Sequence, residues 1–422
     1  MQGSVTIAEI YFIGRLGTVS LAAMALVFPL MMLVQMLASG TIGGSVTGVI
    51  ARTLGAGQEE KAEALLWHVL YLSLAFGVAL FIVYLLFGEA ILRLLGGEAI
   101  VLEQALVYVG IFFPGSVVVW LAHMMMGVVR GTGNMKLPAA MMIIAACIQI
   151  PLSGILILGI GPLPSLGISG AAISILTVNL VNASLLIFLH GTGQLRIQLK
   201  VSQIRPRLEY FNLILSVAAI AAIAPFFTVF TILFMTGLVG RYGTEALAGY
   251  GIAARIEFLI TPLAFGLGIA MNTMVGSCVG AGLFQRAERV GWIGGLCTGA
   301  LTGLAGILLA LFPEFWIQIF SDDPATLAMA SSYFQITGPF FGFFGMGLSL
   351  FFASQGAGAV GWPVVATACR FGVVVGGGWL IANLPDSHPG QLFMCIAAGM
   401  FIFFLGTSSA LYLGTWRKSE NV

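Results

Sequence analysis

Charged residues are scarce in this chain. Only 8% of its 422 residues are Asp, Glu, Lys or Arg, and the formal net charge is +1. A near-neutral chain with so few charges offers no basic patch for a polyanion, so no nucleic-acid partner is expected. The mean hydropathy is +1.06. The core of a soluble protein could not bury this much apolar surface, so the composition indicates a membrane protein.

Clustered catalytic residues are absent as well. The sequence contains no Gly-x4-Gly-Lys-Ser/Thr loop, which argues against direct ATP hydrolysis. The histidines fall on different predicted segments and form no His-x3-His pair: His68, His123, His190 and His388. The cysteines form no Cys-x-x-Cys pair, and we interpret them as buried free thiols: Cys147, Cys278, Cys297, Cys369 and Cys395. We therefore expect neither an enzyme nor a metal or cofactor site.

Long apolar runs follow one another along the chain. A run of about 20 mostly apolar residues is long enough to cross the hydrocarbon core of a bilayer. Eleven complete spans are predicted, at residues 18–45, 64–87, 100–129, 138–160, 167–190, 210–239, 245–275, 290–312, 325–353, 361–384 and 391–414. The sequence thus predicts an all-α integral membrane protein.

The chain contains an internal repeat. Residues 55–138 recur 225 positions later, so that Gly55-Ala56-Gly57 returns as Gly280-Ala281-Gly282, Tyr108 as Tyr333, Pro114 as Pro339, and Pro138 as Pro363. Upstream, Gly14-Arg15 matches Gly240-Arg241 at an offset of 226. Such a duplication in a very hydrophobic chain is typical of a transporter with its site between two homologous lobes. The predicted lobes are residues 1–190 and 210–422, joined by a linker at 191–209.

The first 13 residues are too few for a complete span. As a helix they would extend about 20 Å, against about 30 Å of hydrocarbon. The second copy has a complete predicted helix, 210–239, before its matching Gly240. We therefore expect the chain to begin inside a twelfth span, which would make six helices in each lobe.

The positive charges predict the orientation. One set of loops, with the C-terminal tail, holds Arg52, Lys61, Arg130, Lys136, Arg196, Lys200, Arg205, Arg207, Arg286, Arg289, Arg417 and Lys418, whereas the opposite loops hold only Arg15, Arg93 and Arg241. By the positive-inside rule, the first set is cytoplasmic. The linker and the C-terminus are then expected inside, and the protein is expected in the cytoplasmic membrane.

Few charges lie at membrane depth, and each is a candidate for function. These are Glu9, Arg255, Glu257 and Arg370, with Glu103 near an outer end. An ionised side chain in hydrocarbon costs about 3 kcal/mol or more, so each is expected to face the interior, a partner or water. Glu9 is the best candidate, because a carboxylate there can take a proton from outside and release it later in the cycle. A structural ion pair between Arg370 and Glu257 is the favoured interpretation of the arginine, and Arg255 is also expected to pair with a group on a neighbouring helix.

Aromatic and sulfur-containing residues could line a cavity. The chain holds 31 Phe and 18 Met, and soft, polarizable walls suit flat lipophilic cations. Phe230 and Phe234 are candidates, together with Arg255, Glu257 and Arg370. His123 lies mid-span beside Met124, and a hydrogen-bonded interior histidine is favoured there over a proton carrier. Ordinary packing explains most of these aromatic residues equally well.

Several segments together resemble a known family. They are the segment from Glu9 to Gly17, then Leu21-Ala22-Ala23, Gly55-Ala56-Gly57, Lys61-Ala62, and Arg130-Gly131-Thr132-Gly133 with Pro138. In this combination the chain resembles the multidrug and toxic compound extrusion (MATE) family of cation-coupled exporters. The resemblance implies a V-shaped transporter of twelve helices in two lobes, exporting organic cations and other drugs in exchange for H+ or Na+. Its expected partners are small organic molecules and membrane lipid, and we expect a monomer.

The resemblance also assigns a coupling site. Family members often have an acid in the first helix, where Glu9 lies here, and many have an Asn and an Asp four residues apart in the fifth helix. The matching positions here are Gln149 and Ser153. A Na+ site favours several oxygen ligands with more than one charge, so this substitution favours H+ as the coupling ion. The acids that another branch of the family uses in its seventh and tenth helices are missing.

Three functional hypotheses follow. The first is a proton-coupled exporter that uses Glu9, Gln149 and Ser153. The second keeps the fold but moves a lipid-linked oligosaccharide, for which Arg255 and Arg370 are the only interior cations available to a pyrophosphate. The third, a membrane enzyme or a passive channel, is disfavoured because a catalytic cluster and a recognisable filter are missing.

Overall fold

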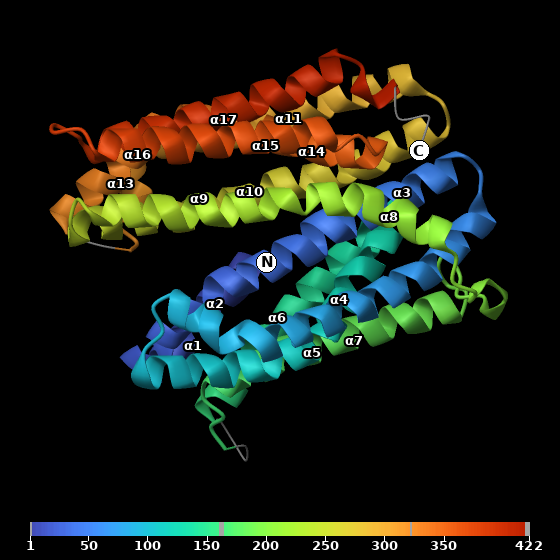
Figure 1. Cartoon of the computed structure of the whole chain (residues 1–422), viewed down its shortest axis with the longest axis horizontal. Coiled ribbons are helices and arrows are strands. Elements are labelled where there is room, and N and C mark those ends of the chain that lie inside the picture. Colours follow the sequence, from blue (N-terminus) through green and yellow to red (C-terminus); the bar gives the residue numbers. More distant parts are fainter. Residues whose placement is uncertain (1, 160–163, 321–322, 418–422) are drawn as a thin grey trace. The chain divides into compact units, whose positions relative to one another are not determined.

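The structure is a computed structural model that describes residues 2–159, 164–320 and 323–417 (Figure 1). These residues form helices joined by short connections. Eleven helices or continuous runs of helices within the described ranges are long and apolar enough to cross a membrane, which confirms the predicted number of complete spans. The chain divides into two compact units, Met1–Ile50 with Gln58–Ile214 and Ala51–Gly57 with Leu215–Val422.

The first unit contains the N-terminal helices. In chain order they are α1 (Gln2–Gly14), α2 (Thr18–Gln35), the π-helix η1 (Met36–Ile42), α3 (Gly43–Gly55), α4 (Glu59–Leu94), α5 (Ala99–Gly131), α6 (Lys136–Leu158), α7 (Ile168–Gly191) and the 3-10 helix η2 (Val201–Gln203). α5 packs against α4 and α7, while α6 packs against α7 and α1 (Figure 1). The last turn of α3 belongs to the second unit.

The second unit contains the remaining helices. They are α8 (Leu208–Ala221, whose first turns belong to the first unit), α9 (Ile223–Gly240), α10 (Thr244–Gly280), α11 (Phe284–Leu311), α12 (Pro313–Ile317), α13 (Pro324–Thr337), the 3-10 helix η3 (Gly338–Phe340), α14 (Phe341–Ala357), α15 (Gly361–Phe371), the π-helix η4 (Gly372–Gly376), α16 (Gly377–Ala382) and α17 (Pro389–Tyr412). α14 packs against α10, α11 and α17, and α15 packs against α17.

A glycine turn recurs at equivalent places in the two units. Gly17 precedes α2 with φ 117°, and Gly243 precedes α10 with φ 109°. Residues with a Cβ rarely adopt a positive φ of this size. Glycine permits the turn, whereas another residue at this position would have a strained backbone. The two positions are 226 residues apart, the offset at which Gly14-Arg15 matches Gly240-Arg241. The repeat in the sequence is thus a repeat of backbone geometry.

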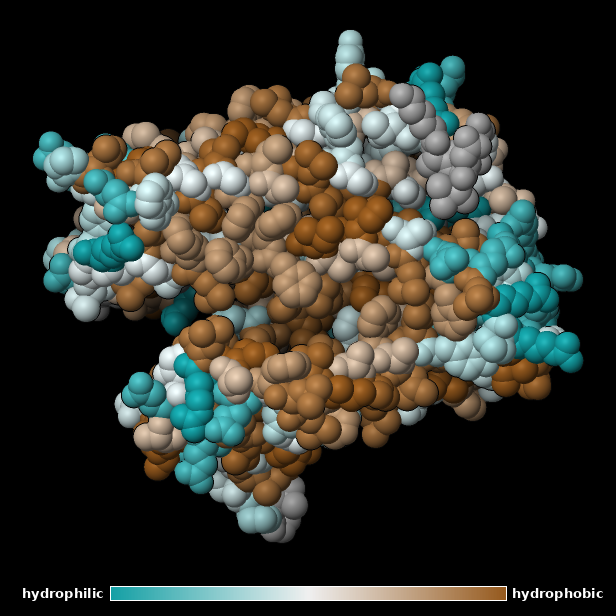
Figure 2. Space-filling view, in the orientation of Figure 1, coloured by the Kyte–Doolittle hydropathy of each residue, from teal (hydrophilic) through white to brown (hydrophobic). Residues whose placement is uncertain are grey.

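The surface fits a bilayer. Figure 2 shows hydrophobic side chains over the flanks of the helices and hydrophilic side chains gathered mainly at helix ends. The expectation that the cysteines are buried is wrong for three of them, because Cys147, Cys297 and Cys369 are exposed. All five are free thiols. A helix flank that faces lipid needs only apolar character, so hydropathy alone does not separate it from a buried flank.

Candidate functional site

Glu9 is buried within the first unit. It lies on α1, which packs against α6, and its residue surface is only 8% exposed. The side-chain amide of Gln149 on α6 donates a hydrogen bond to Oε1 of Glu9 over 3.1 Å. Glu9 has no salt-bridge partner among the residues that the structure describes. The acid is therefore held by a neutral donor and has no fixed countercharge.

Ser153 follows Gln149 by one helical turn on α6. It is fully buried, and its hydroxyl finds no hydrogen-bond partner within the described part of the chain. Residues four apart lie on the same face of a helix, so this hydroxyl and the Gln149 amide share the face that bears on α1. A buried hydroxyl without a hydrogen bond raises the free energy of the folded state. A change in its surroundings that offers a donor or an acceptor would therefore be stabilised by a new hydrogen bond to Ser153.

Tyr108 on α5 is a neighbour of Glu9 that sequence reasoning did not include in the site. Its phenol is buried and interacts electrostatically with Glu9. The signal that could have identified it is its match with Tyr333 across the repeat. The surroundings of Glu9 thus combine one carboxylate with amide, hydroxyl and phenol groups.

His123 on α5 has both ring nitrogens engaged. Nδ1 lies 2.9 Å from the carbonyl oxygen of Val119, and Nε2 lies 2.9 Å from the side-chain nitrogen of Gln35. A carbonyl only accepts, so Nδ1 carries the proton and Nε2 accepts from the Gln35 amide. This geometry fits the favoured interpretation of a hydrogen-bonded interior histidine. Gln35 immediately precedes the π-helix η1, whose wider turn the sequence did not predict.

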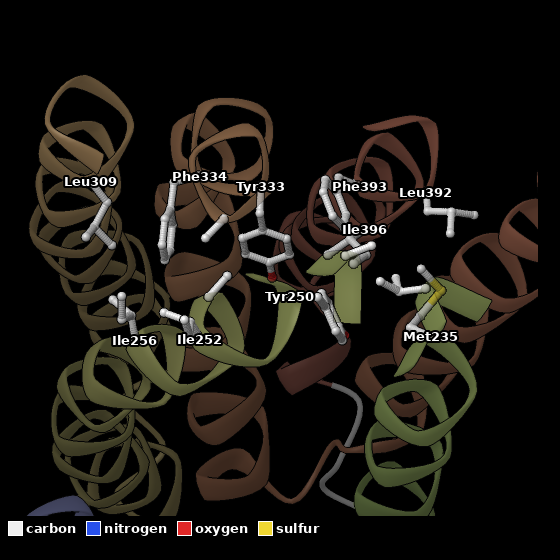
Figure 3. Close-up of a cluster of buried hydrophobic side chains, with 14 of the residues drawn as sticks. Met235, Tyr250, Ile252, Ile256, Leu309, Tyr333, Phe334, Leu392, Phe393 and Ile396 are labelled. Carbon is white, nitrogen blue, oxygen red and sulfur yellow. The ribbon is translucent and has the colours of Figure 1, made fainter. Parts of the chain in front are cut away.

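In the second unit, Glu257 on α10 is bound by a tyrosine. The hydroxyl of Tyr333 on α13 donates to Oε2 of Glu257 over 2.5 Å. Tyr333 packs edge-on against Tyr250 and Phe393 in the buried cluster of Figure 3. Within the described part of the chain, Tyr333 is therefore the side chain that fixes the carboxyl group of Glu257.

Arg370 on α15 does not form the expected ion pair with Glu257. The two groups interact electrostatically, but no salt bridge joins them within residues 2–159, 164–320 and 323–417. The guanidinium instead lies 4.8 Å from the ring centre of Phe344 and 5.9 Å from that of Phe403. The expectation was wrong because aromatic rings hold the arginine by cation–π contact while Tyr333 occupies the carboxylate.

Arg255 is exposed, which corrects the expectation that it faces the interior. It lies two residues before Glu257 on α10, and residues two apart point to different sides of a helix. Because Glu257 faces Tyr333 of α13, Arg255 points outward. The structure does not bring Arg255 together with Glu257 and Arg370 as one cluster.

Phe230 and Phe234 lie on α9. Their ring centres are 6.5 Å apart, and Phe230 is also 5.8 Å from Phe371 on α15. Phe230 is exposed and Phe234 is half-buried. Both rings therefore keep some surface that a ligand could contact.

The second unit has no polar counterpart of the Glu9 site. By the offset of 226, Glu9 corresponds to Met235; by the offset of 225, Gln149 and Ser153 correspond to Val374 and Gly378. A Cβ placed on Gly378 would lie 3.2 Å from Sδ of Met235, so these counterparts also face each other. Met235 lies in the apolar cluster of Figure 3. The duplication kept the packing of these helices but only one polar site.

Comparison with known proteins agrees with this architecture. The family model MatE matches residues 1–155 and 217–380 of the chain. The FAD transporter of Shewanella oneidensis is 28% identical over 335 residues, which cover 78% of this chain and 73% of that protein. The probable multidrug resistance protein YoeA of Bacillus subtilis is 28% identical over 359 residues, covering 84% of this chain and 77% of its own.

Solved structures share the fold. A transporter of the MOP superfamily from Pyrococcus furiosus, described as having a binding pocket of reverse polarity, superposes with a TM-score of 0.91 at 20% identity, over 98% of this chain and 92% of that one. An outward-facing multidrug resistance MATE family transporter superposes with a TM-score of 0.90 at 21% identity, with the same coverage of both chains. These similarities confirm the predicted fold class.

Proposed function

The chain belongs to the MatE family of multidrug efflux transporters, and on this premise we propose that it is a proton-coupled antiporter for organic cations. It is a multi-pass membrane protein and a transporter, not an enzyme. What is proposed is the coupling ion, the residues that bind it, and the class of cargo.

The buried hydrogen bond from Gln149 to Glu9 supports the proposal most strongly. A carboxylate oxygen accepts from the amide in the charged state. A protonated Glu9 becomes a donor as well, and the Ser153 hydroxyl on the same face of α6, which has no partner among the described residues, is available to accept a hydrogen bond. Loading and unloading of one proton thus changes how α1 bonds to α6. Coupling requires that proton and drug favour different states of such an element.

The chemistry of these groups favours H+ over Na+. The Gln149 group directed at Glu9 is an N–H donor, and a donor opposes a bound cation. A Na+ ion also needs several oxygen ligands around it. A proton needs only one acceptor, which Glu9 supplies.

The aromatic pair Phe230 and Phe234 supports a flat cationic cargo, because ring faces attract cations. The relatedness to an FAD transporter makes FAD the comparison cargo of choice, since FAD is flat but carries phosphates. The lipid-linked oligosaccharide alternative is weaker. It needs two interior arginines for a pyrophosphate, whereas Arg255 is exposed and Arg370 packs on phenylalanine rings.

We also propose a cytoplasmic-membrane location with the linker 191–209 and the C-terminus inside, from the positive charges of those segments. The functional form in this proposal is a monomer.

Transport into proteoliposomes tests the function. We expect a fluorescent lipophilic cation such as ethidium to accumulate against its gradient when the lumen is acidic, and to leave when the pH gradient is collapsed. A Na+ gradient is expected to have no effect. Accumulation driven by Na+ at equal pH would contradict proton coupling, and accumulation of FAD in place of ethidium would contradict the cationic cargo.

A further inference from the structure

The linker between the repeats is fastened to α4 by its backbone. The indole of Trp67 donates to the carbonyl of Lys200 over 2.9 Å, and the hydroxyl of Tyr71, one turn further on, donates to the carbonyl of Ile204 over 2.6 Å. Between them, Nε2 of the fully buried His68 accepts from the backbone N–H of Arg207 over 2.8 Å. Three hydrogen bonds therefore join residues 200–207 to α4.

Two arginines of this segment have no acidic partner among the residues that the structure describes. Arg196 pairs with Glu59 at 2.7 Å and Lys200 pairs with Glu63 at 2.8 Å, which uses two carboxylates of α4. Arg205 and Arg207 are exposed, and no salt bridge reaches either of them within the part of the chain that the structure describes. Arg207 donates to the Tyr210 hydroxyl, a neutral group. The segment thus presents two uncompensated guanidinium groups.

Apolar side chains accompany these charges. Val201 is 74% exposed, Ile204 is 41% exposed and Leu208 is 81% exposed. Leu208 is also the first residue of the span Leu208–Gly240, and α4 begins its own span at Glu59. The segment therefore lies at the ends of two spans, where basic and apolar side chains together face headgroups and the first acyl carbons.

A cavity lies where the charges and the apolar residues meet. Its volume is about 430 Å³, and it is lined by Ala64 of α4, residues 201–205 and Arg207. The planar guanidinium of arginine can donate two parallel hydrogen bonds to two oxygens of one phosphate, which the ammonium of lysine cannot do. We propose that this cavity binds the phosphate of an anionic phospholipid between Arg205 and Arg207, with the acyl chains along Val201 and Leu208.

Native mass spectrometry of the purified full-length chain in neutral detergent tests this site. The probes are phosphatidylglycerol and phosphatidylcholine with the same acyl chains, and inorganic phosphate. We expect the double variant Arg205→Gln/Arg207→Gln to bind phosphatidylglycerol about 30-fold more weakly, which corresponds to about 1 kcal/mol for each arginine. Phosphatidylcholine binding is expected to stay weak in both proteins.

The matched control is Arg286→Gln/Arg289→Gln, which removes two exposed arginines near the start of α11 and is expected to leave phosphatidylglycerol binding unchanged. A third variant, Val201→Asn/Leu208→Asn, keeps both charges and is expected to weaken the lipid but not inorganic phosphate. Equal losses in the two arginine variants would overturn the site. If phosphatidylcholine bound as tightly as phosphatidylglycerol, the occupant would not be an anionic lipid. The same conclusion would follow if the third variant bound phosphatidylglycerol as tightly as wild type.

Discussion

Tyr108 and Tyr333 occupy equivalent positions in the two repeats, and each lies beside a glutamate. Tyr108 interacts electrostatically with Glu9, and Tyr333 donates a hydrogen bond to Glu257. The glutamates themselves are not equivalent, because Met235 stands where the second repeat would have its Glu9. The tyrosine is thus common to the two repeats, whereas the glutamate beside it lies on α1 in the first repeat and on α10 in the second, which are not equivalent helices.

Removing the Tyr333 hydroxyl is expected to destabilise the protein. In Tyr333→Phe the half-buried Glu257 loses its donor, which costs about 1 to 3 kcal/mol. Thermal unfolding in detergent should show a lower melting temperature. Tyr412→Phe is the control, because Tyr412 is 82% exposed. If Tyr333→Phe had the same melting temperature as the control, the hydrogen bond would contribute nothing to stability. The single variant Glu257→Gln and the double variant Glu257→Gln/Tyr333→Phe complete a double-mutant cycle that measures the interaction between the two side chains.

A close backbone contact within the second unit, between residues 52–55 and the end of α10, is expected to tolerate no side chain. Gly55 and Gly280 are repeat equivalents, and a Cβ on Gly55 would overlap the Ser277 carbonyl while one on Gly280 would overlap the Arg52 carbonyl. All these residues lie in the second unit. Gly280→Ala is therefore expected to destabilise by about 1 to 3 kcal/mol, measured by thermal unfolding.

The same helix offers a control for this substitution. Nothing lies within 4 Å of a Cβ on Gly251 of α10, so Gly251→Ala is expected to be neutral or to stabilise by up to about 1 kcal/mol. Should Gly280→Ala behave like Gly251→Ala, the contact between the helix ends is not close in solution.

The linker is expected to loosen when its indole donor is removed. Trp67→Phe deletes the hydrogen bond to Lys200 O, a loss of about 1 kcal/mol, which raises the open population about five-fold. Limited trypsin cleavage after Lys200 and Arg207 should accelerate by that factor. Trp379→Phe, at a residue that is 54% exposed, should leave the cleavage rate unchanged. Equal rates in wild type and Trp67→Phe would mean that other contacts hold the segment.

Acid is expected to weaken the start of α13. The Thr326 hydroxyl and backbone N–H donate to the Asp323 carboxylate, which lowers the pKa of Asp323 below its usual 3.8. A lowered pKa gives stability that is present above the unfolded value and is lost as the pH falls through the folded value. The melting temperature of wild type should therefore drop toward that of Asp323→Asn below about pH 4. A constant difference between the two proteins from pH 3 to pH 7 would contradict this role.

The sequence was sufficient for the membrane fold and the duplication, because both depend on local patterns. Hydropathy identifies the spans along the chain. The repeat is visible because turns with a positive φ, such as those at Gly17 and Gly243, require glycine at matching positions. The π-helices η1 and η4 were not predicted. A π-helix differs from an α-helix by one extra residue in a turn, and this leaves the hydropathy of the span almost unchanged.

The side-chain partners were harder to predict, since they depend on how helices face one another. The exposure of Arg255 follows from the direction in which Glu257 is buried, and the position of Arg370 follows from the rings of Phe344 and Phe403 on other helices. Neither direction is readable from spacing along one helix. The coupling role of Glu9, Gln149 and Ser153 stays a prediction.

The most direct test of that role measures protons released when cargo binds. Purified protein in a weakly buffered detergent solution is mixed with saturating ethidium, and the pH change is recorded between pH 5 and pH 8. We predict release of about one proton per molecule from wild type and from Glu103→Gln, whose carboxylate is exposed. Glu9→Gln is predicted to bind ethidium and release none. Equal proton release from Glu9→Gln and wild type would contradict Glu9 as the coupling residue.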